Sequence, residues 1–263
     1  MRQFFLIPII AISVLISGCH RAALMEKIAS AKNVQSAKNY IALLRAGQYD
    51  SIEKDLNPSL RTPNIRETLV AMAGMIPPQN PLSVKIVGAQ QFTQNLSGQK
   101  STTTNITFEY HFPQQWLLVN VANRKSEGVS SIVGFRVKPI ADSLEHINKF
   151  SLPGKTPLDY LVLVLAVAVP LFIVYALARC VRMRALRRKW LWIVFIMLGV
   201  GQFAVNWTTG QWLLNPLYLQ VLGASAFAPP YGPWILSFSL PIGAMVFLLR
   251  KKKLVKATTV VPS

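Results

Sequence analysis

Glu109 and His111 stand two residues apart in a segment where apolar and polar side chains alternate. A carboxylate and an imidazole at that spacing lie on one face of a β-strand, where they could act as a proton-transfer pair. Phe108 and Tyr110 fall on the opposite face and should point into the core. We therefore expect Glu109 and His111 to belong to a solvated outer face, and an enzyme that uses them is the weakest of the functions considered.

The other residues that could bind a metal or act as a nucleophile are scattered. His20 and His146 lie far apart in the sequence, without the spacing of a metal site. Cys19 and Cys180 are too few for a disulfide framework or a thiolate zinc site. The sequence also lacks a Gly-rich phosphate loop, a nucleophile elbow and an HExxH motif. We expect no enzymatic activity, no metal and no cofactor.

The composition indicates that part of the chain avoids water. Of 263 residues, 52% are hydrophobic and only 14% are charged, although the formal net charge is +18. Soluble domains usually carry about a quarter charged residues. A strong positive charge can indicate nucleic-acid binding, but here the basic residues gather in two blocks beside apolar segments, Arg179–Lys189 and Arg250–Lys256. That placement is typical of membrane proteins, so we expect a membrane rather than a nucleic acid.

The first residues have the organisation of an export signal. Arg2 precedes an apolar run over 4–16, which is too short to span a membrane comfortably. The run ends in Ile16-Ser17-Gly18-Cys19. This tetrapeptide resembles the lipobox of bacterial lipoproteins, which implies that residues 1–18 are a signal peptide and that the Cys19 thiol is diacylated. Buried acyl chains would then hold the new N-terminus at the bilayer. An uncleaved signal anchor, with an ordinary Cys19, is the alternative.

Residues 156–263 are predicted to form an all-α transmembrane region of three helices. The predicted spans are 158–178, 190–207 and 234–249, and the first, at about 1.5 Å per residue, matches the hydrocarbon thickness. Residues 212–228 are apolar but contain Asn215-Pro216, and we predict that they form an interfacial or re-entrant segment.

Charge supports three spans over four. An exported N-terminal domain makes the first span run inward, which places the Arg179–Lys189 block in the cytoplasm. With three spans the Arg250–Lys256 block also lies in the cytoplasm, whereas a fourth span would place it outside. Gln202 and Asn206 are the strongly polar side chains of the second predicted span. We expect Gln202 to bond a neighbouring helix and Asn206 to lie at the headgroup boundary.

Residues 19–155 are predicted to form an α+β domain, with helices first and a curved antiparallel sheet after them. A three- and four-residue apolar period predicts a helix over 22–46, and shorter helices follow at 49–56 and from Thr62. Alternation then predicts strands over 84–92, 106–112, 116–123 and 131–138, with a bulge near Gly88 and a turn at 126–128. Residues 95–104 are predicted to be a polar loop.

Parts of this domain resemble nuclear transport factor 2-like domains. The resemblance rests on residues 43–50 (LLRAGQYD), 56–60 (LNPSL), 116–121 (WLLVNV) and 132–137 (IVGFRV). It implies a curved sheet folded over the helices around a cone-shaped cavity. Some relatives are enzymes and many bind small molecules, so the fold alone does not decide the function. Four aromatic residues could line such a cavity, although we interpret them as core residues: Tyr40, Tyr49, Trp116 and Phe135.

These patterns favour an inner-membrane lipoprotein. In the leading hypothesis, the periplasmic domain over 19–155 is a non-enzymatic binding or assembly module that contacts a protein partner in an envelope complex. The chain would contact membrane lipid through the Cys19 acyl chains and its three spans, and its C-terminus would be cytoplasmic. The alternative is a module that binds a small hydrophobic ligand in the cone-shaped cavity.

Overall fold

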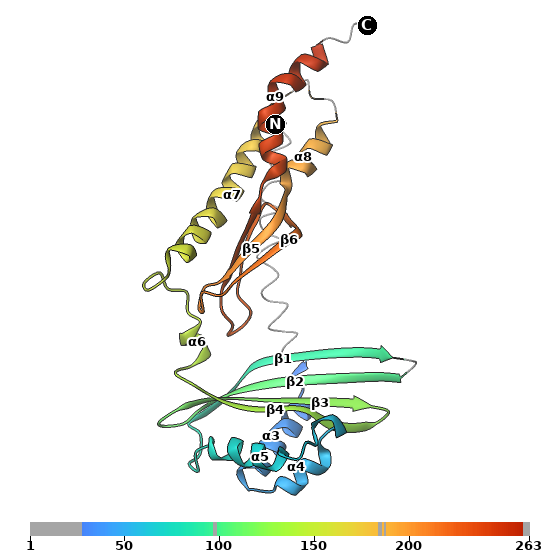
Figure 1. Ribbon diagram of the computed structural model, residues 1–263, viewed down its shortest axis with the longest axis vertical. Helices are drawn as coiled ribbons and strands as arrows, with labels where there is room; N and C mark the ends of the chain where they lie inside the picture. The colour runs from blue at the N-terminus through green and yellow to red at the C-terminus, as the bar shows by residue number, and fades with distance from the viewer. Residues whose placement is uncertain (1–27, 97–98, 184–185, 187, 260–263) are drawn as a thin grey trace. The chain divides into compact units, whose positions relative to one another are not determined.

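The computed structural model describes residues 28–96, 99–183, 186 and 188–259, which form two compact units (Figure 1). The N-terminal unit comprises Met1–Ile147 and Pro229–Tyr231, and the C-terminal unit comprises Asn148–Ala228 and Gly232–Ser263. Each unit contains a four-stranded antiparallel sheet. The chain is therefore an α+β protein.

The N-terminal unit begins with helices. They are α3 (Ala31–Arg45), α4 (Tyr49–Asp55), the 3-10 helix η1 (Pro58–Leu60) and α5 (Ile65–Gly74). The buried side chains of α3 recur at three- and four-residue steps: Ala37, Tyr40, Ile41 and Leu44. The helix predicted over 22–46 is interrupted, because Ser30 adopts an extended backbone (ψ 150°) in front of α3. The first part of that predicted helix, up to residue 27, lies outside the described residues.

The four strands that follow form a meander in the order β1-β2-β3-β4. They are β1 (Ser83–Leu96), β2 (Gln99–His111), β3 (Trp116–Ser126) and β4 (Val129–Ile140). The predicted bulge is confirmed by a register shift between Ile86 and Gly88. Glu127 and Gly128 both have positive φ, which is the geometry of a two-residue hairpin turn between β3 and β4. The polar loop predicted over 95–104 is wrong, since β1 and β2 pair as far as Leu96 and Gln99.

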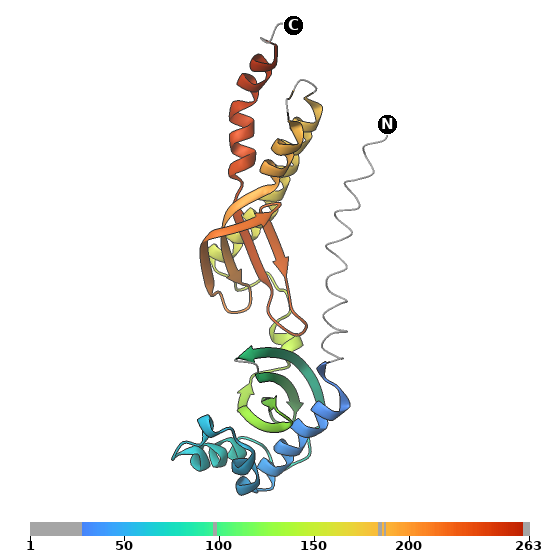
Figure 2. The same ribbon diagram turned by 90° about the vertical axis from the view of Figure 1, so that its right-hand side faces the viewer.

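The sheet of this unit is strongly curved, and α3 lies alongside it (Figure 2). Side chains from three helices and three strands form one core, in which Leu44, Ile52, Phe108, Leu117 and Ile132 are fully buried. The alternating residues of β2 explain this packing, because Ile106, Phe108 and Tyr110 share one face. A short helix, α6 (Leu144–Ile147), follows β4.

The C-terminal unit combines three helices with a second sheet. Its helices are α7 (Pro157–Arg182), α8 (Lys189–Met197) and α9 (Ile242–Thr259). Its strands are β5 (Leu198–Asn206), β6 (Trp212–Val221), β7 (Ala224–Phe227) and β8 (Ile235–Leu240), in the order β6-β5-β8-β7. A capping box between Thr156 and Asp159 begins α7, with Pro157 in its first turn. Buried residues of α7 pack against the sheet and against the other two helices.

The predicted all-α region of three transmembrane helices is wrong. The second predicted span, 190–207, divides into α8 and β5, and the third, 234–249, divides into β8 and α9. Residues 212–228, predicted to lie in the interface, form β6 and β7. Apolar runs of this kind do not distinguish a buried strand from a buried helix. Two features favour the strands: Gly201 takes a positive φ (+73°) within β5, and Pro241 separates β8 from α9.

Of the described helices, α7 is the one long and apolar enough to cross a membrane, by length and composition. Its best window has a mean hydropathy of 2.9, and 22% of that window is buried within the protein. Large apolar side chains on its remaining surface are exposed, among them Leu161, Val164, Val167, Leu171 and Val174. The structure therefore offers one candidate span where the sequence indicates three.

The expectation that Gln202 bonds a neighbouring helix is wrong, because the polar residues of the second predicted span contact the second sheet and one of its turns. The Gln202 amide donates to Ser237 Oγ (3.3 Å) and accepts from Asn215 Nδ2 (3.3 Å) across neighbouring strands. Asn206 Oδ1 accepts from the backbone N–H groups of Thr208 and Thr209 in the turn that follows β5. Both side chains thus stabilise the second sheet.

Candidate functional site

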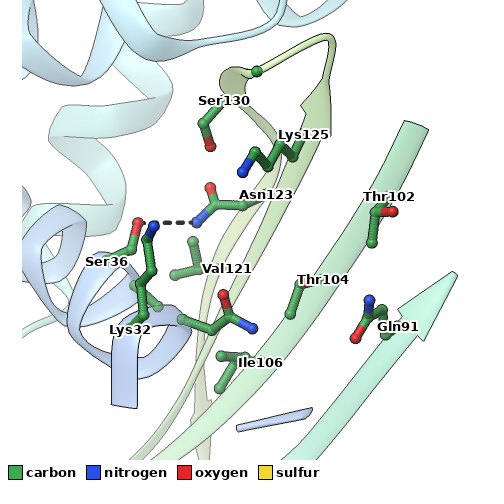
Figure 3. A pocket seen from close by; sticks show the side chains of 13 residues that line it. Lys32, Ser36, Gln91, Thr102, Thr104, Ile106, Val121, Asn123, Lys125 and Ser130 are labelled. Carbon is green, nitrogen blue, oxygen red and sulfur yellow. Dashed lines mark hydrogen bonds between the residues drawn. The ribbon is translucent and has the colours of Figure 1, made fainter. Parts of the chain in front are cut away.

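A cavity of about 410 Å³ opens in the N-terminal unit between α3 and the helix-covered face of the sheet. The first turns of α3 contribute Lys32, Asn33, Ser36 and Ala37, and all four strands or their connecting turns contribute the rest (Figure 3). The polar strand residues of the lining are Gln91, Thr102, Thr104, Asn123, Lys125 and Ser130. Ala37, Ile106 and Val121 form its apolar floor, where the cavity meets the core.

The alternation of the strands explains why polar residues line this cavity. Val121, Asn123 and Lys125 follow one another at two-residue steps along β3 and line the same cavity. The same holds for Thr102, Thr104 and Ile106 on β2, so each strand changes from apolar to polar along one face. The face that forms the core near the strand centres therefore becomes a polar surface near the β3–β4 turn.

The charged side chains of the lining are both positive. Lys32 and Lys125 are exposed at the cavity, and none of its lining residues within the described part of the chain is acidic. The first turn of α3 also contains no acidic residue, and the Ser30 side chain makes no cap hydrogen bond. The N–H groups of that turn add to the positive potential. The cavity is therefore suited to a negatively charged or electron-rich ligand.

Asn123 connects the two sides of the cavity. Its Nδ2 donates to Ser36 Oγ on α3 at 3.4 Å. Its Oδ1 is buried and has no hydrogen-bond partner among the described residues. In Figure 3 the amines of Lys32 and Lys125 end on either side of this amide. Because an unpaired buried acceptor costs free energy, Asn123 presents a hydrogen-bonding position that a ligand with an O–H group can fill.

Glu109 and His111 lie on the face of β2 opposite to the cavity lining, and neither lines the cavity. The expectation that Glu109 is solvated is wrong, because only 4% of the residue is exposed. Glu109 Oε2 accepts the backbone N–H of Leu144 at 2.6 Å, which places the first residue of α6 over this carboxylate. His111 is half-buried and stacks on the Trp116 ring, with 3.8 Å between ring centroids.

The aromatic residues singled out from the sequence do not line the cavity either. Tyr40 is buried in the core, and its hydroxyl donates to Asp55 Oδ2 at 2.9 Å. Tyr49 and Phe135 pack against the same core. Trp116 lies on the opposite face of the sheet with His111. The interpretation as core residues is therefore confirmed for Tyr40, Tyr49 and Phe135 and wrong for Trp116.

Sequence reasoning missed the polar residues that do line the cavity. The signal was available, because Asn123 and Lys125 continue the inward-facing phase that Val119 and Val121 begin. Polar side chains in the inward phase of a strand indicate either a solvated end of the sheet or a binding surface. What the sequence did not show was that α3 would close one side and convert this end into a cavity.

Two other expectations concern sites outside this cavity. The lipid attachment predicted at Cys19 lies outside the described residues. Within the described part of the chain, no group of three His, Cys, Asp or Glu side chains is placed to hold a metal ion. No family model, no curated protein and no solved structure matches the chain.

Proposed function

We propose that this chain is a non-enzymatic binding module attached to the bacterial inner membrane, and that its N-terminal unit binds a polar ligand within an envelope complex. The observation that carries this proposal is the cavity between α3 and the sheet. Its volume of about 410 Å³ falls within the usual range of small-ligand sites, about 300–1,000 Å³.

The lining favours a polar ligand over the hydrophobic one that was considered from the sequence. Ligand sites for hydrophobic molecules are lined mainly by apolar and aromatic side chains. Here the side chains around the opening are lysines, amides and hydroxyls, and the lining contains no aromatic residue among those described. A hydrophobic ligand would displace water from these groups without offering them new hydrogen bonds.

Attachment to the membrane is proposed from α7 and from the lipobox resemblance. The exposed apolar side chains of α7 would contact lipid, and acyl chains on Cys19 would provide a second anchor. Arg179 and Arg182 lie in the last turn of α7, which by the bias of basic residues toward the cytoplasm makes that end the inner one. Residues 19–155 would then be periplasmic and the C-terminus cytoplasmic.

Site-specific photo-crosslinking in intact cells tests the binding role. A photoreactive residue at Thr102, which lines the cavity, should give adducts that the same residue at Lys138, exposed on β4, does not give. Ser130→Trp should abolish those adducts, because the indole would fill the cavity mouth. Equal adducts from both positions, or adducts that survive Ser130→Trp, would show that the cavity is not the binding site.

A further inference from the structure

The charge and hydrogen-bonding capacity of the cavity together specify a class of ligand. We propose that it binds a hydroxylated phosphate ester, such as a phosphorylated polyol or the headgroup of an anionic phospholipid. This inference rests on the proposed binding role of the same cavity and adds the ligand's chemistry. Its three components are a pair of lysines, a ring of hydroxyl and amide groups, and one buried acceptor.

The two lysines account for the phosphate. Lys32 extends from α3 and Lys125 from β3, and no acidic side chain among the described lining residues neutralises them (Figure 3). At pH 7 a phosphate monoester carries a charge of about −1.5 to −2 and a phosphodiester headgroup about −1, so two ammonium groups match the monoester more closely. A carboxylate carries only one negative charge, whereas lysine is a common phosphate ligand in proteins.

Neutral donors around the lysines suit the phosphate oxygens. Ser36 on α3 and Thr102 and Thr104 on β2 line the cavity with hydroxyl-bearing side chains, and the Thr102 hydroxyl lies 3.3 Å from Thr93 Oγ1. The first-turn N–H groups of α3 lie beside them without a side-chain cap, and N–H groups at a helix N-terminus favour anions. These groups give the phosphate a set of hydrogen-bond donors in addition to the two charges.

Asn123 accounts for the hydroxyl group of the ligand. Its Nδ2 already donates to Ser36, so its buried Oδ1 needs a donor. Inorganic phosphate can donate to this acceptor only through its own P–OH group, whereas the hydroxyl of an ester stands on a separate carbon and can donate to it while the phosphate stays between the lysines. A ligand with both groups should therefore bind more tightly than either inorganic phosphate or the free polyol.

Calorimetric titration of the full-length chain in a non-ionic detergent tests this assignment. Glycerol phosphate should bind, inorganic phosphate should bind more weakly, and glycerol should not bind measurably. Rising salt should weaken the binding of glycerol phosphate, because the lysine contacts are partly exposed. Equal binding of glycerol and glycerol phosphate, or binding that does not respond to salt, would overturn the inference.

Single substitutions test whether glycerol phosphate binds in this cavity. Lys32→Gln and Lys125→Gln should each weaken binding of glycerol phosphate about tenfold, which is typical of one lost charge-assisted contact. Asn123→Asp, which is almost isosteric, should weaken it at least as much by adding a negative charge. Lys38→Gln removes an exposed lysine of the same helix that does not line the cavity and should change nothing. If Lys38→Gln weakened the binding of glycerol phosphate as much as Lys32→Gln, the loss would reflect the overall charge of the protein, and the assignment of the cavity as the binding site would be wrong.

The source of the phosphate ester is distinguished by competition. Vesicles of phosphatidylcholine and phosphatidylglycerol should displace glycerol phosphate if the natural ligand is a lipid headgroup, and vesicles of phosphatidylcholine alone should not. If neither vesicle competes while glycerol phosphate still binds, the ligand is a soluble ester. Crosslinking from Thr102 without any binding of glycerol phosphate would leave the binding role standing and remove the phosphate assignment.

Discussion

At the scale of single residues, the contact between Tyr40 and Asp55 ties α3 to the end of α4. Tyr40 is 8% exposed, and its hydroxyl donates to the Asp55 carboxylate at 2.9 Å. We expect Tyr40→Phe to lower the free energy of unfolding of this unit by about 1 kcal/mol, the usual net value of one such hydrogen bond. Hydrogen exchange of peptides from α3 and α4 measures this loss of stability. Tyr49→Phe is the matched control, and an equal effect there would contradict the assignment.

The same tyrosine should make stability depend on pH in the alkaline range. Burial, followed by the hydrogen bond to Asp55, raises the pKa of Tyr40 to about 12, and burial raises the pKa of Tyr110 to about 12 as well. An unfolded tyrosine titrates near 10. The folded state therefore retains protons that the unfolded state loses, and the stability from these residues is complete below pH 10 and disappears between about pH 10 and 12.

Unfolding measured across that pH range tests this coupling. The free energy of unfolding of the wild type should fall more steeply above pH 10 than that of a Tyr40→Phe, Tyr110→Phe double variant. The near-ultraviolet absorbance of tyrosinate reports the ionisation directly. Identical slopes in the two proteins would show that neither hydroxyl is coupled to folding in this way.

Glu109 is predicted to be structural. Its carboxylate is buried and accepts the N–H of Leu144, which begins α6. Glu109→Ala would leave that N–H unpaired and should cost about 1–3 kcal/mol of stability, with faster hydrogen exchange in α6. Glu109→Gln keeps an acceptor oxygen and should retain most of the stability. Protection of α6 that is unchanged in Glu109→Ala would contradict this role.

At the scale of elements, a close approach in the C-terminal unit requires glycine. A Cβ added to Gly243, near the start of α9, would lie 1.8 Å from the backbone oxygen of Phe195 in α8. Because backbone cannot move aside cheaply, Gly243→Ala should separate these helices and destabilise the unit by about 2 kcal/mol or more. Thermal unfolding in detergent measures the change.

Gly74→Ala is the control for Gly243→Ala. Gly74 is the last residue of α5, and a Cβ added there would meet nothing within 4 Å. Gly74→Ala should therefore stabilise the protein by about 0.4–1 kcal/mol, through the lower entropy of the unfolded chain. The two substitutions should change the free energy of unfolding in opposite directions. A loss of stability in both would show that the effect of Gly243→Ala does not come from the contact with Phe195.

The two sheets differ in how far the sequence predicts them. In β2 the alternation of Ile106, Phe108 and Tyr110 with polar neighbours specifies both a strand and the face that it buries. In the C-terminal unit, the run 198–206 has polar side chains only at Gln202 and Asn206, four residues apart, so no two-residue period indicates a strand. The cavity is predictable only in part. The sequence shows that Asn123 faces inward on its strand, but the closure of the cavity by α3 depends on a long-range contact that the sequence does not show.

At the scale of the whole molecule, one helix decides whether the chain is integral to the membrane. The apolar surface of α7 that remains exposed includes Leu171, 64% exposed near the middle of the helix. A lysine at the centre of a membrane span costs about 2.5–3.5 kcal/mol of insertion free energy. If α7 crosses the bilayer, Leu171→Lys should impair insertion, whereas Leu171→Met should not.

The predicted lipid at Cys19 would hold the chain at the membrane by itself, so α7 must be tested without it. With residues 1–19 replaced by a cleavable signal peptide that is not lipidated, alkaline carbonate should leave the chain with Leu171 or Leu171→Met in the membrane pellet and release a larger fraction of Leu171→Lys. Release of that chain with Leu171 intact would show that α7 does not span. Its exposed apolar side chains would then have to be covered by protein, because water-exposed apolar surface of that extent marks an interface.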